Sequence, residues 1–269
     1  MKAIISKAAR RKWAWVLALV MIVSIVIPTS LLTAKADVGT VKFIDGAAGW
    51  LESAYAQWTI DNQAEGYTAY IKKASQSDSA YARIDNELIR KYKNYYRVDA
   101  VGLAAGDYVI KVVPVKNGKE VTDKAQVTKT LNVSSYDRSG FAFSSESKYK
   151  TGSGAYNDDG TLKQDAVVLY VTKDTAKTVT MTVKTDTNKT TKCVGIQSII
   201  DALQKGKETR PVDIRIIGTV TKNDLDKISS SSEGLQVKGK NAYSDMKLTI
   251  EGVGSDACIK DFGILVRNA

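Results

Sequence analysis

The sequence contains no histidine, and this absence narrows the chemistry that the chain can perform. Histidine is the base in the usual Ser/His and Cys/His catalytic arrangements and a common zinc ligand, so those arrangements and His-ligated zinc are excluded. We therefore expect any chemistry of this chain to use carboxylates, lysine, arginine, tyrosine or a metal ion held by oxygen ligands.

Acidic residues are absent from residues 1–36, which hold six of the 39 basic residues. A basic stretch up to Lys12 precedes an apolar run over residues 13–27, and Ala34-Lys35-Ala36 has the small-x-small form of a signal peptidase site. We expect a signal peptide, cleavage after Ala36, and a secreted, extracellular protein that is then free of the membrane. The alternative is an uncleaved anchor, although the apolar run is shorter than the ~20 residues that span a bilayer.

Cysteine is scarce, with Cys193 and Cys258 the two in the chain. Outside the cytoplasm they could form a disulfide, and closing this loop would stabilise the fold by on the order of 4 kcal/mol. They could equally be two separate thiols, because the sequence does not place their Cα atoms within bridging distance. Neither is predicted to be a catalytic nucleophile.

The chain beyond residue 36 carries little net charge. It has 33 basic and 29 acidic residues, so the formal net charge falls from +10 to +4. We therefore expect no nucleic-acid partner, because such partners favour a strong basic excess. The whole chain has 269 residues, 43% of them hydrophobic, which is enough for one large domain or two ordinary ones.

Short strands are predicted at spacings of about ten residues in the first half of the chain. Alternating, aromatic-rich runs separated by turn residues cover residues 54–58, 67–71, 95–98 and 108–115. This pattern is typical of a β-sandwich. The aromatic and basic run KYKNYYR (91–97) could form a sugar-binding face, but we favour the interpretation that it covers a strand and its preceding loop.

Three features of this half resemble a fibronectin type III domain, which we place over residues 37–135. They are Trp58 on an early strand, Gly66-Tyr67 at the start of the next, and the stretch LAAGDYVIKVVPV (103–115). The resemblance implies that Tyr108 lies at a strand corner, where its hydroxyl bonds to the backbone.

The second half combines short strands with one helix. Ile196, Ile199, Ile200 and Leu203 recur at helical spacing before a glycine, so a short amphipathic helix is predicted over residues 195–205. Strands are predicted at 166–171, 179–183, 212–220, 234–239, 248–254 and 259–266. Tight hairpin signals are missing after the helix, which favours successive coils of a parallel β-helix with the helix covering an open end.

Four stretches in this order resemble the amino-terminal region of secreted bacterial pectate lyases. They are GAYNDDGTLK (154–163), GIQSIIDAL (195–203), RPVDIRIIGTVT (210–221) and LTIEGVGSDA (248–257). The resemblance implies the start of a right-handed parallel β-helix over residues 136–269. It also implies an enzyme that cleaves polygalacturonate (pectate) by β-elimination, with calcium bridging substrate and protein carboxylates and an arginine as base.

The resemblance transfers no catalytic or metal-binding residue to this chain. In the family, the calcium-binding aspartates and the catalytic arginine lie on later coils, so we expect the end of the chain to be a cut and the chain alone to be inactive. Asp256, Asp261 and Arg267 occupy first-coil positions and are assigned no role. Asp158-Asp159-Gly160 is interpreted as a turn rather than a calcium loop, and Gly252-x-Gly254 lacks the third glycine of a dinucleotide fingerprint.

The sequence thus predicts a mainly β protein made of a fibronectin type III-like sandwich and the capped start of a parallel β-helix. Its predicted function is that of the amino-terminal portion of a secreted pectate lyase, a monomer acting on an acidic polysaccharide. Calcium is the cofactor of the full-length family, and none is expected to be held by this chain. The alternative is a non-catalytic extracellular carbohydrate-binding or surface protein.

Overall fold

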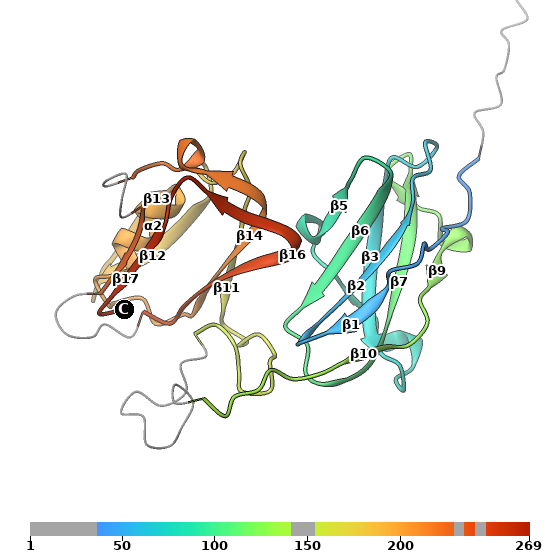
Figure 1. Ribbon diagram of the computed structural model, residues 1–269, viewed down its shortest axis with the longest axis horizontal. Helices are drawn as coiled ribbons and strands as arrows, with labels where there is room; N and C mark the ends of the chain where they lie inside the picture. The colour runs from blue at the N-terminus through green and yellow to red at the C-terminus, as the bar shows by residue number, and fades with distance from the viewer. Residues whose placement is uncertain (1–36, 141–153, 229–233, 240–245) are drawn as a thin grey trace, which may run out of the picture. The chain divides into compact units, whose positions relative to one another are not determined.

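The computed structural model describes residues 37–140, 154–228, 234–239 and 246–269. The predicted signal peptide, its cleavage site and the alternative anchor lie outside these residues. The chain divides into two units, Met1–Val38 and Gly39–Ala269. No helix within the described residues is long and apolar enough to cross a membrane. The described part is mainly β, as predicted, and α2 (Ile196–Leu203) is its one α-helix (Figure 1).

Two antiparallel sheets over residues 48–133 form a sandwich (Figure 1). The first sheet has the order β1-β2-β6-β5, and the second has the order β10-β7-β3-β4 with β8 and β9 also paired to β7. The strands are β1 (Ala48–Trp50), β2 (Ser53–Thr59), β3 (Gly66–Lys73), β4 (Ala82–Arg83), β5 (Ile89–Lys91), β6 (Tyr95–Val101), β7 (Gly106–Lys116), β8 (Lys119–Glu120), β9 (Gln126–Val127) and β10 (Leu131–Val133).

The alternation that predicted these strands also places their core side chains. In β2, Ala54, Ala56 and Trp58 are buried, and the residues between them are partly exposed. Trp58 has no exposed surface, and its ring lies 5.1 Å from that of Tyr67 and 5.9 Å from that of Tyr96, centroid to centroid. An aromatic cluster of this kind buries much apolar area and stabilises the contact between the two sheets.

Tyr108 lies where it was predicted to lie, at the start of β7. Its ring is buried, and its hydroxyl donates a hydrogen bond to the backbone carbonyl of Ala104 at 3.0 Å. Burial raises the pKa of Tyr108, so the hydroxyl stays protonated and able to donate.

We expect Tyr108→Phe to lower the free energy of unfolding by about 1 kcal/mol, because the carbonyl of Ala104 loses this donor while the packing of the ring is kept. Urea denaturation measures the change. Tyr81→Phe is the matched control, because the contacts of Tyr81 with Lys72 and Lys111 involve its ring, and its hydroxyl makes no hydrogen bond within the described part of the chain. Equal stability of the Tyr108 variant and the parent would contradict the assigned role.

A parallel three-stranded sheet forms from residues that lie far apart in the second half. Its order is β11 (Val167–Val171), β14 (Val212–Thr221) and β16 (Leu248–Lys260). A second parallel pair joins β15 (Leu235–Lys238) to β17 (Ile264–Arg267). Leu169, Ile214 and Ile250 occupy matching positions across the first sheet, so their aliphatic side chains form a row on one face.

Two strand predictions in this half need correction. The predicted strand 259–266 is wrong in its bounds, because β16 continues to Lys260 and the chain then turns at Asp261, which has a φ of 66°. The antiparallel hairpin of β12 (Thr180–Asp186) with β13 (Lys189–Val194) was only half predicted. The sequence KTTKCV of β13 is polar with one buried residue, so it carries no apolar run.

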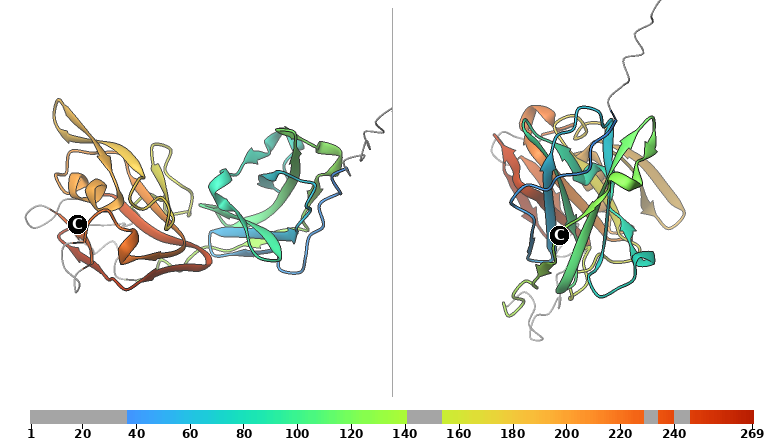
Figure 2. Two further views of the ribbon diagram at one scale, coloured as in Figure 1. Left: turned by 90° about the horizontal axis from the view of Figure 1, so that it is seen from above. Right: turned by 90° about the vertical axis from the view of Figure 1, so that its right-hand side faces the viewer.

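The helix α2 confirms the predicted amphipathic segment with slightly tighter bounds. It lies against β12, β13 and β15 (Figure 2). Its buried isoleucines share a core cluster with Val212, Ile214 and Ile216. The carboxylate of Asp226 accepts hydrogen bonds from the backbone N–H groups of Gln197 at 2.9 Å and Ser198 at 3.0 Å. A residue distant in sequence thus satisfies the first turn of a helix that begins after a glycine.

The four 3₁₀ helices of the described residues lie in connections, at Asp78–Ala80, Asn86–Leu88, Thr122–Lys124 and Lys222–Asp224. Both cysteines are free, Cys193 buried on β13 and Cys258 exposed on β16.

All strand pairs within the described residues join residues 48–133 to each other or residues 167–267 to each other. The boundary at 135/136 and the β-helix start remain predictions.

Candidate functional site

A row of polar side chains crosses the parallel sheet on the face opposite its aliphatic row. Tyr170 on β11, Arg215 on β14 and Glu251 on β16 are direct partners in the strand register. Asp213 precedes Arg215 by two residues, so it lies on the same face. The parallel register therefore brings together charges that are far apart in the chain.

Tyr156, from the turn-rich segment before β11, completes this buried polar cluster. Its hydroxyl lies 3.0 Å from Oδ2 of Asp213 and 2.5 Å from Oε1 of Glu251, and Nη2 of Arg215 donates to it at 3.0 Å. Nε of Arg215 contacts the same two carboxylate oxygens at 2.8 and 3.0 Å. Nη1 of Arg215 donates to the hydroxyl of Tyr170 at 3.1 Å, and that hydroxyl donates to Asp85 at 2.5 Å.

Two carboxylates share one guanidinium in this cluster, which sets its protonation. Asp213 has no exposed surface, and its Oδ1 makes no hydrogen bond. Burial, followed by the nearby charge of Glu251, raises the pKa of Asp213 to about 7, although Arg215 opposes the shift. The hydroxyl of Tyr156 has one proton for two acceptors, so a proton on Asp213 relieves the repulsion between the two carboxylates.

The cluster is better suited to holding the fold than to catalysis. A carboxylic acid with a raised pKa is a candidate acid or base, but Asp213 is completely enclosed and no substrate reaches it. Burial raises the pKa of both Tyr156 and Tyr170, so both hydroxyls remain protonated donors. Glu251 is the member of the carboxylate pair that keeps some exposure.

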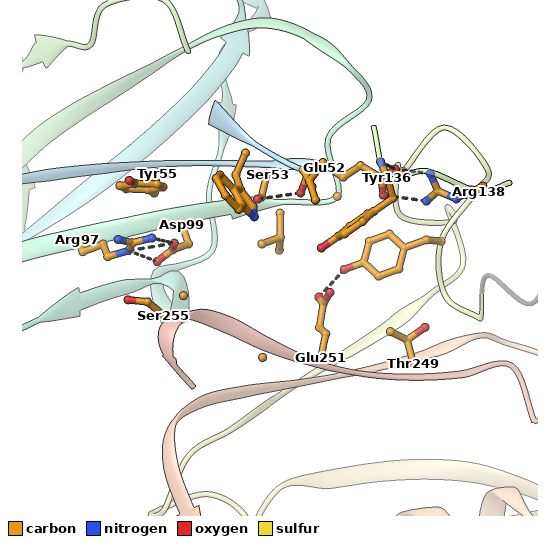
Figure 3. A pocket seen from close by; sticks show the side chains of 18 residues that line it. Glu52, Ser53, Tyr55, Arg97, Asp99, Tyr136, Arg138, Thr249, Glu251 and Ser255 are labelled. Carbon is orange, nitrogen blue, oxygen red and sulfur yellow. Dashed lines mark hydrogen bonds and ion pairs between the residues drawn. The ribbon is translucent and has the colours of Figure 1, made fainter. Parts of the chain in front are cut away.

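Glu251 and Tyr156 also line an open pocket of about 690 Å³. Residues of β1, β2, β6 and the segment after β10 form one side of this pocket, and β16 forms the other. Figure 3 shows Tyr136 and Glu251 reaching into it from opposite sides, with Arg97 and Asp99 on a third wall.

Two ion pairs lie in the polar lining of the pocket. Arg97 donates to both oxygens of Asp99 at 2.7–3.1 Å, and its guanidinium lies 3.8 Å from the ring centroid of Tyr55. Arg138 forms a two-bond pair with Glu52, one bond of 2.8 Å running from Nη2 to Oε2. Such forked pairs hold both partners in a defined orientation.

The turn that contains Asp158-Asp159-Gly160 packs against Glu52 in the lining of the pocket. Oδ1 of Asp159 accepts hydrogen bonds from the backbone N–H and the hydroxyl of Thr161, at 3.0 and 2.6 Å. Gly160 has a φ of +87°, and a Cβ there would lie 2.3 Å from Glu52. The segment is thus a turn packed on the pocket, and the described residues contain no group of three or more acidic or cysteine side chains able to hold a metal ion.

The aromatic and basic run at 91–97 is largely occupied by contacts within the protein. Tyr96 stacks on Trp58, and Tyr92 stacks on Tyr95 with ring centroids 4.8 Å apart. The hydroxyl of Tyr92 donates to Asp256 at 2.9 Å. These contacts favour the interpretation of the run as strand and loop cover over that of a sugar-binding face.

The residues near the end of the chain take structural positions. Asp256 lies in a bulge of β16, where the ladder to β14 is interrupted, and accepts a hydrogen bond from Nη1 of Arg90 at 2.9 Å. Asp261 occupies the turn between β16 and β17, and Arg267 lies opposite Lys238 in the β15–β17 pair. Gly252-x-Gly254 lies within β16 and precedes that bulge, so it has no phosphate-binding turn into a helix.

The buried cluster and the pocket were both missed by sequence reasoning. One signal was present: Asp213 and Arg215 alternate with apolar residues in VDIRII (212–217), a strand that was treated as an apolar run. Charges in a strand that is buried along most of its length require partners. Their identity, Glu251 and Tyr156, depends on register and could not be predicted from spacing.

Comparisons with known proteins give no family for this chain. No protein-family model matches it, and no curated protein matches it. Among solved structures, chitinase ChiW from Paenibacillus sp. str. FPU-7 aligns with 53% of this chain and 10% of its own, at 11% identity and a TM-score of 0.30. An Fn3-like protein from Clostridium thermocellum aligns with 38% of this chain and 100% of its own, at 16% identity and a TM-score of 0.24.

The pectate lyase Pel3 from Pectobacterium carotovorum is also structurally similar in part. It aligns with 81% of this chain and 55% of its own, at 11% identity and a TM-score of 0.23. This chain therefore spans about a tenth of the chitinase and about half of the pectate lyase. Similarities this weak do not identify a shared function, so the pectate lyase resemblance stays a prediction.

Proposed function

We propose that this chain is the amino-terminal portion of a secreted pectate lyase, an enzyme that cleaves polygalacturonate by calcium-assisted β-elimination. Residues 1–36 would direct export and be removed after Ala36. Residues 37–135 would form a fibronectin type III-like module, and residues 136–269 the first coils of a right-handed parallel β-helix. The working partner of the complete enzyme, acting as a monomer, would be an acidic polysaccharide outside the cell.

The observation that carries this proposal is the order in which the chain passes through two pairs of parallel strands. It passes through β14 and then β15, and afterwards through β16 and then β17. β14 pairs with β16 and β15 pairs with β17, both in parallel. In a parallel β-helix each coil contributes one strand to each sheet, in the same order, and pairs with the coil before it. The two strand pairs follow this order. The aligned Leu169, Ile214 and Ile250 support the same interpretation.

The described residues do not fit a calcium site, so no reaction step is assigned to them through calcium. Glu251 and Asp213 contact Arg215, and Asp256 contacts Arg90. Calcium favours six to eight oxygen ligands, and no cluster of carboxylates in the described part of the chain approaches that set. We expect this chain to supply the folded start of the enzyme and the full enzyme to supply the cation site on other coils.

The nucleotide sequence after the codon for Ala269 tests the proposal. We expect it to encode further coils with spaced aspartates and an arginine, in the same or an adjoining reading frame. The extended protein should release unsaturated uronides from polygalacturonate when calcium is present and lose that activity with a chelator. The 269-residue chain should release none.

Two outcomes would contradict this function. One is a stop codon with no adjoining frame that encodes coils. The other is an extended protein that folds, as judged by circular dichroism, but leaves polygalacturonate intact with calcium present. Release of unsaturated uronides by the 269-residue chain would contradict the narrower claim that it lacks the catalytic residues.

The second candidate function is that of a non-catalytic extracellular carbohydrate-binding protein. The pocket in Figure 3 favours it, because aromatic side chains and fixed ion pairs meet there in an open hollow. Saturable binding of an oligosaccharide without turnover, together with a stop codon and no adjoining coils, would support this candidate over the lyase.

A further inference from the structure

We propose that the pocket lined by Trp50, Tyr136 and the ion pairs Arg97–Asp99 and Arg138–Glu52 binds an uncharged oligosaccharide. This goes beyond the proposed lyase function, because it concerns a different site and a different class of sugar. The pocket is open and has a volume of about 690 Å³. That volume lies within the roughly 300–1,000 Å³ typical of small-molecule sites.

Two aromatic side chains at the pocket remain exposed. Trp50 is 65% exposed and Tyr136 is 52% exposed, so neither contributes much to a core. They belong to segments that approach each other at the end of the sandwich, where Ser134 donates to the backbone carbonyl of Trp50 at 3.1 Å. The flat, apolar C–H face of a pyranose ring suits such exposed aromatic faces, because stacking removes apolar area from water on both partners.

The polar walls suit sugar hydroxyls. Each carboxylate of the two ion pairs is oriented by a forked guanidinium, and Glu52 also accepts a hydrogen bond from the backbone N–H of Tyr136 at 3.2 Å. Asp99 is paired with two arginines, Arg97 and Arg90, whereas Glu52 is paired with Arg138. Glu52 therefore keeps an acceptor position for a ligand, and an arginine has five donor hydrogens. Neighbouring hydroxyls of a sugar, which both donate and accept, match such fixed groups.

The charge of the lining favours an uncharged ligand. Each carboxylate of the lining already has an arginine partner: Glu52 pairs with Arg138, Asp99 with both Arg97 and Arg90, and Glu251 with Arg215. A uronate entering here would have to compete with these carboxylates for a guanidinium, which disfavours binding. The same groups impose no such cost on a neutral sugar.

The test uses the full chain, secreted from a bacterial host, and titration with neutral gluco-, xylo-, manno- and galacto-oligosaccharides and with oligogalacturonate. Trp50 and Trp58 are the tryptophans outside residues 1–36, and Trp58 has no exposed surface. A change in fluorescence and in acrylamide quenching on binding therefore reports on Trp50. We expect saturable binding of at least one neutral series and about tenfold or weaker binding of oligogalacturonate, a difference of about 1.4 kcal/mol.

Substitutions separate stacking from a general effect on the fold. Trp50→Ala and Tyr136→Ala should each weaken binding of the neutral sugar about tenfold or more. Tyr136→Phe keeps the ring and should retain most of the affinity. Val127→Ala, an exposed apolar residue of the second sheet away from the pocket, is the control and should leave binding unchanged. The quenching change should disappear in Trp50→Phe while calorimetry still detects binding.

Three results would overturn this inference. They are no saturable binding of any neutral series, binding of oligogalacturonate as tight as that of the best neutral sugar, and unchanged affinity in Trp50→Ala. None of these results bears on whether further coils complete a pectate lyase, so failure here is distinguishable from failure of the proposed function.

Discussion

Replacing Arg215 with methionine is expected to lower the free energy of unfolding by about 3–5 kcal/mol, because it leaves the buried Asp213 and the partly buried Glu251 without their cation. The guanidinium is 5% exposed and contacts Asp213, Glu251, Tyr156 and Tyr170. Methionine keeps much of the length of the side chain, so the loss reports on charge and hydrogen bonds more than on packing. Urea denaturation near pH 7, followed by circular dichroism, measures it.

Two variants make this result specific. Arg215→Lys keeps the charge but cannot reproduce the four contacts of a planar guanidinium, so an intermediate loss is expected. Lys227→Met removes the cation of a pair with Asp201 whose side chains are 56% and 38% exposed, and it should cost at most about 1 kcal/mol. A methionine variant at position 215 as stable as the one at 227 would contradict the role assigned to Arg215.

The stability of this protein should fall as the pH rises through the range in which Asp213 titrates. The folded-state pKa of Asp213 is raised to about 7 from an ordinary 3.8. Between these values the folded state holds a proton that the unfolded state has lost, so folding is favoured most at low pH. The contribution declines by up to about 1.4 kcal/mol for each pH unit in this window and is constant above about pH 7.

Asp213→Asn tests this dependence, because asparagine keeps the shape of the side chain without titrating. Urea midpoints measured between about pH 4 and about pH 8 should show the variant gaining stability relative to the parent as the pH rises. Asp174→Asn, at an exposed aspartate, is the control and should follow the parent at every pH. Parallel curves for the parent and the Asp213 variant would contradict the raised pKa of Asp213 in this cluster.

Local patterns predicted the long elements of this fold and missed the short ones. β2, β3, β6 and β7 were predicted because they are seven to eleven residues long and rich in apolar and aromatic side chains, which is enough to be recognised. The strands β4, β8 and β9 have two residues each, and pairing with a longer neighbour is what makes them strands. The helix α2 was predicted because four apolar residues at helical spacing leave little ambiguity.

The candidate site was less predictable than the fold. Tyr156 and Asp213 are 57 residues apart, and Arg215 and Glu251 are 36 apart. Nothing in the intervening spacing indicates that they meet, since a shift of one residue in the register would place Glu251 on the opposite face of the sheet. The pocket likewise combines Trp50, Arg138 and Glu251, which come from distant segments.

The sequence by itself determined that this is a mainly β protein without histidine chemistry, because composition excludes reactions and side-chain alternation is a local property. The amphipathic helix was located for the same reason, whereas Tyr108 was placed at a strand corner by the resemblance to fibronectin type III domains. Only the tertiary structure decided that Arg215 serves two carboxylates at once and that an open pocket lies beside Glu251. Both depend on strand register and on loops folding back over a sheet, and these are set by packing summed over the whole chain.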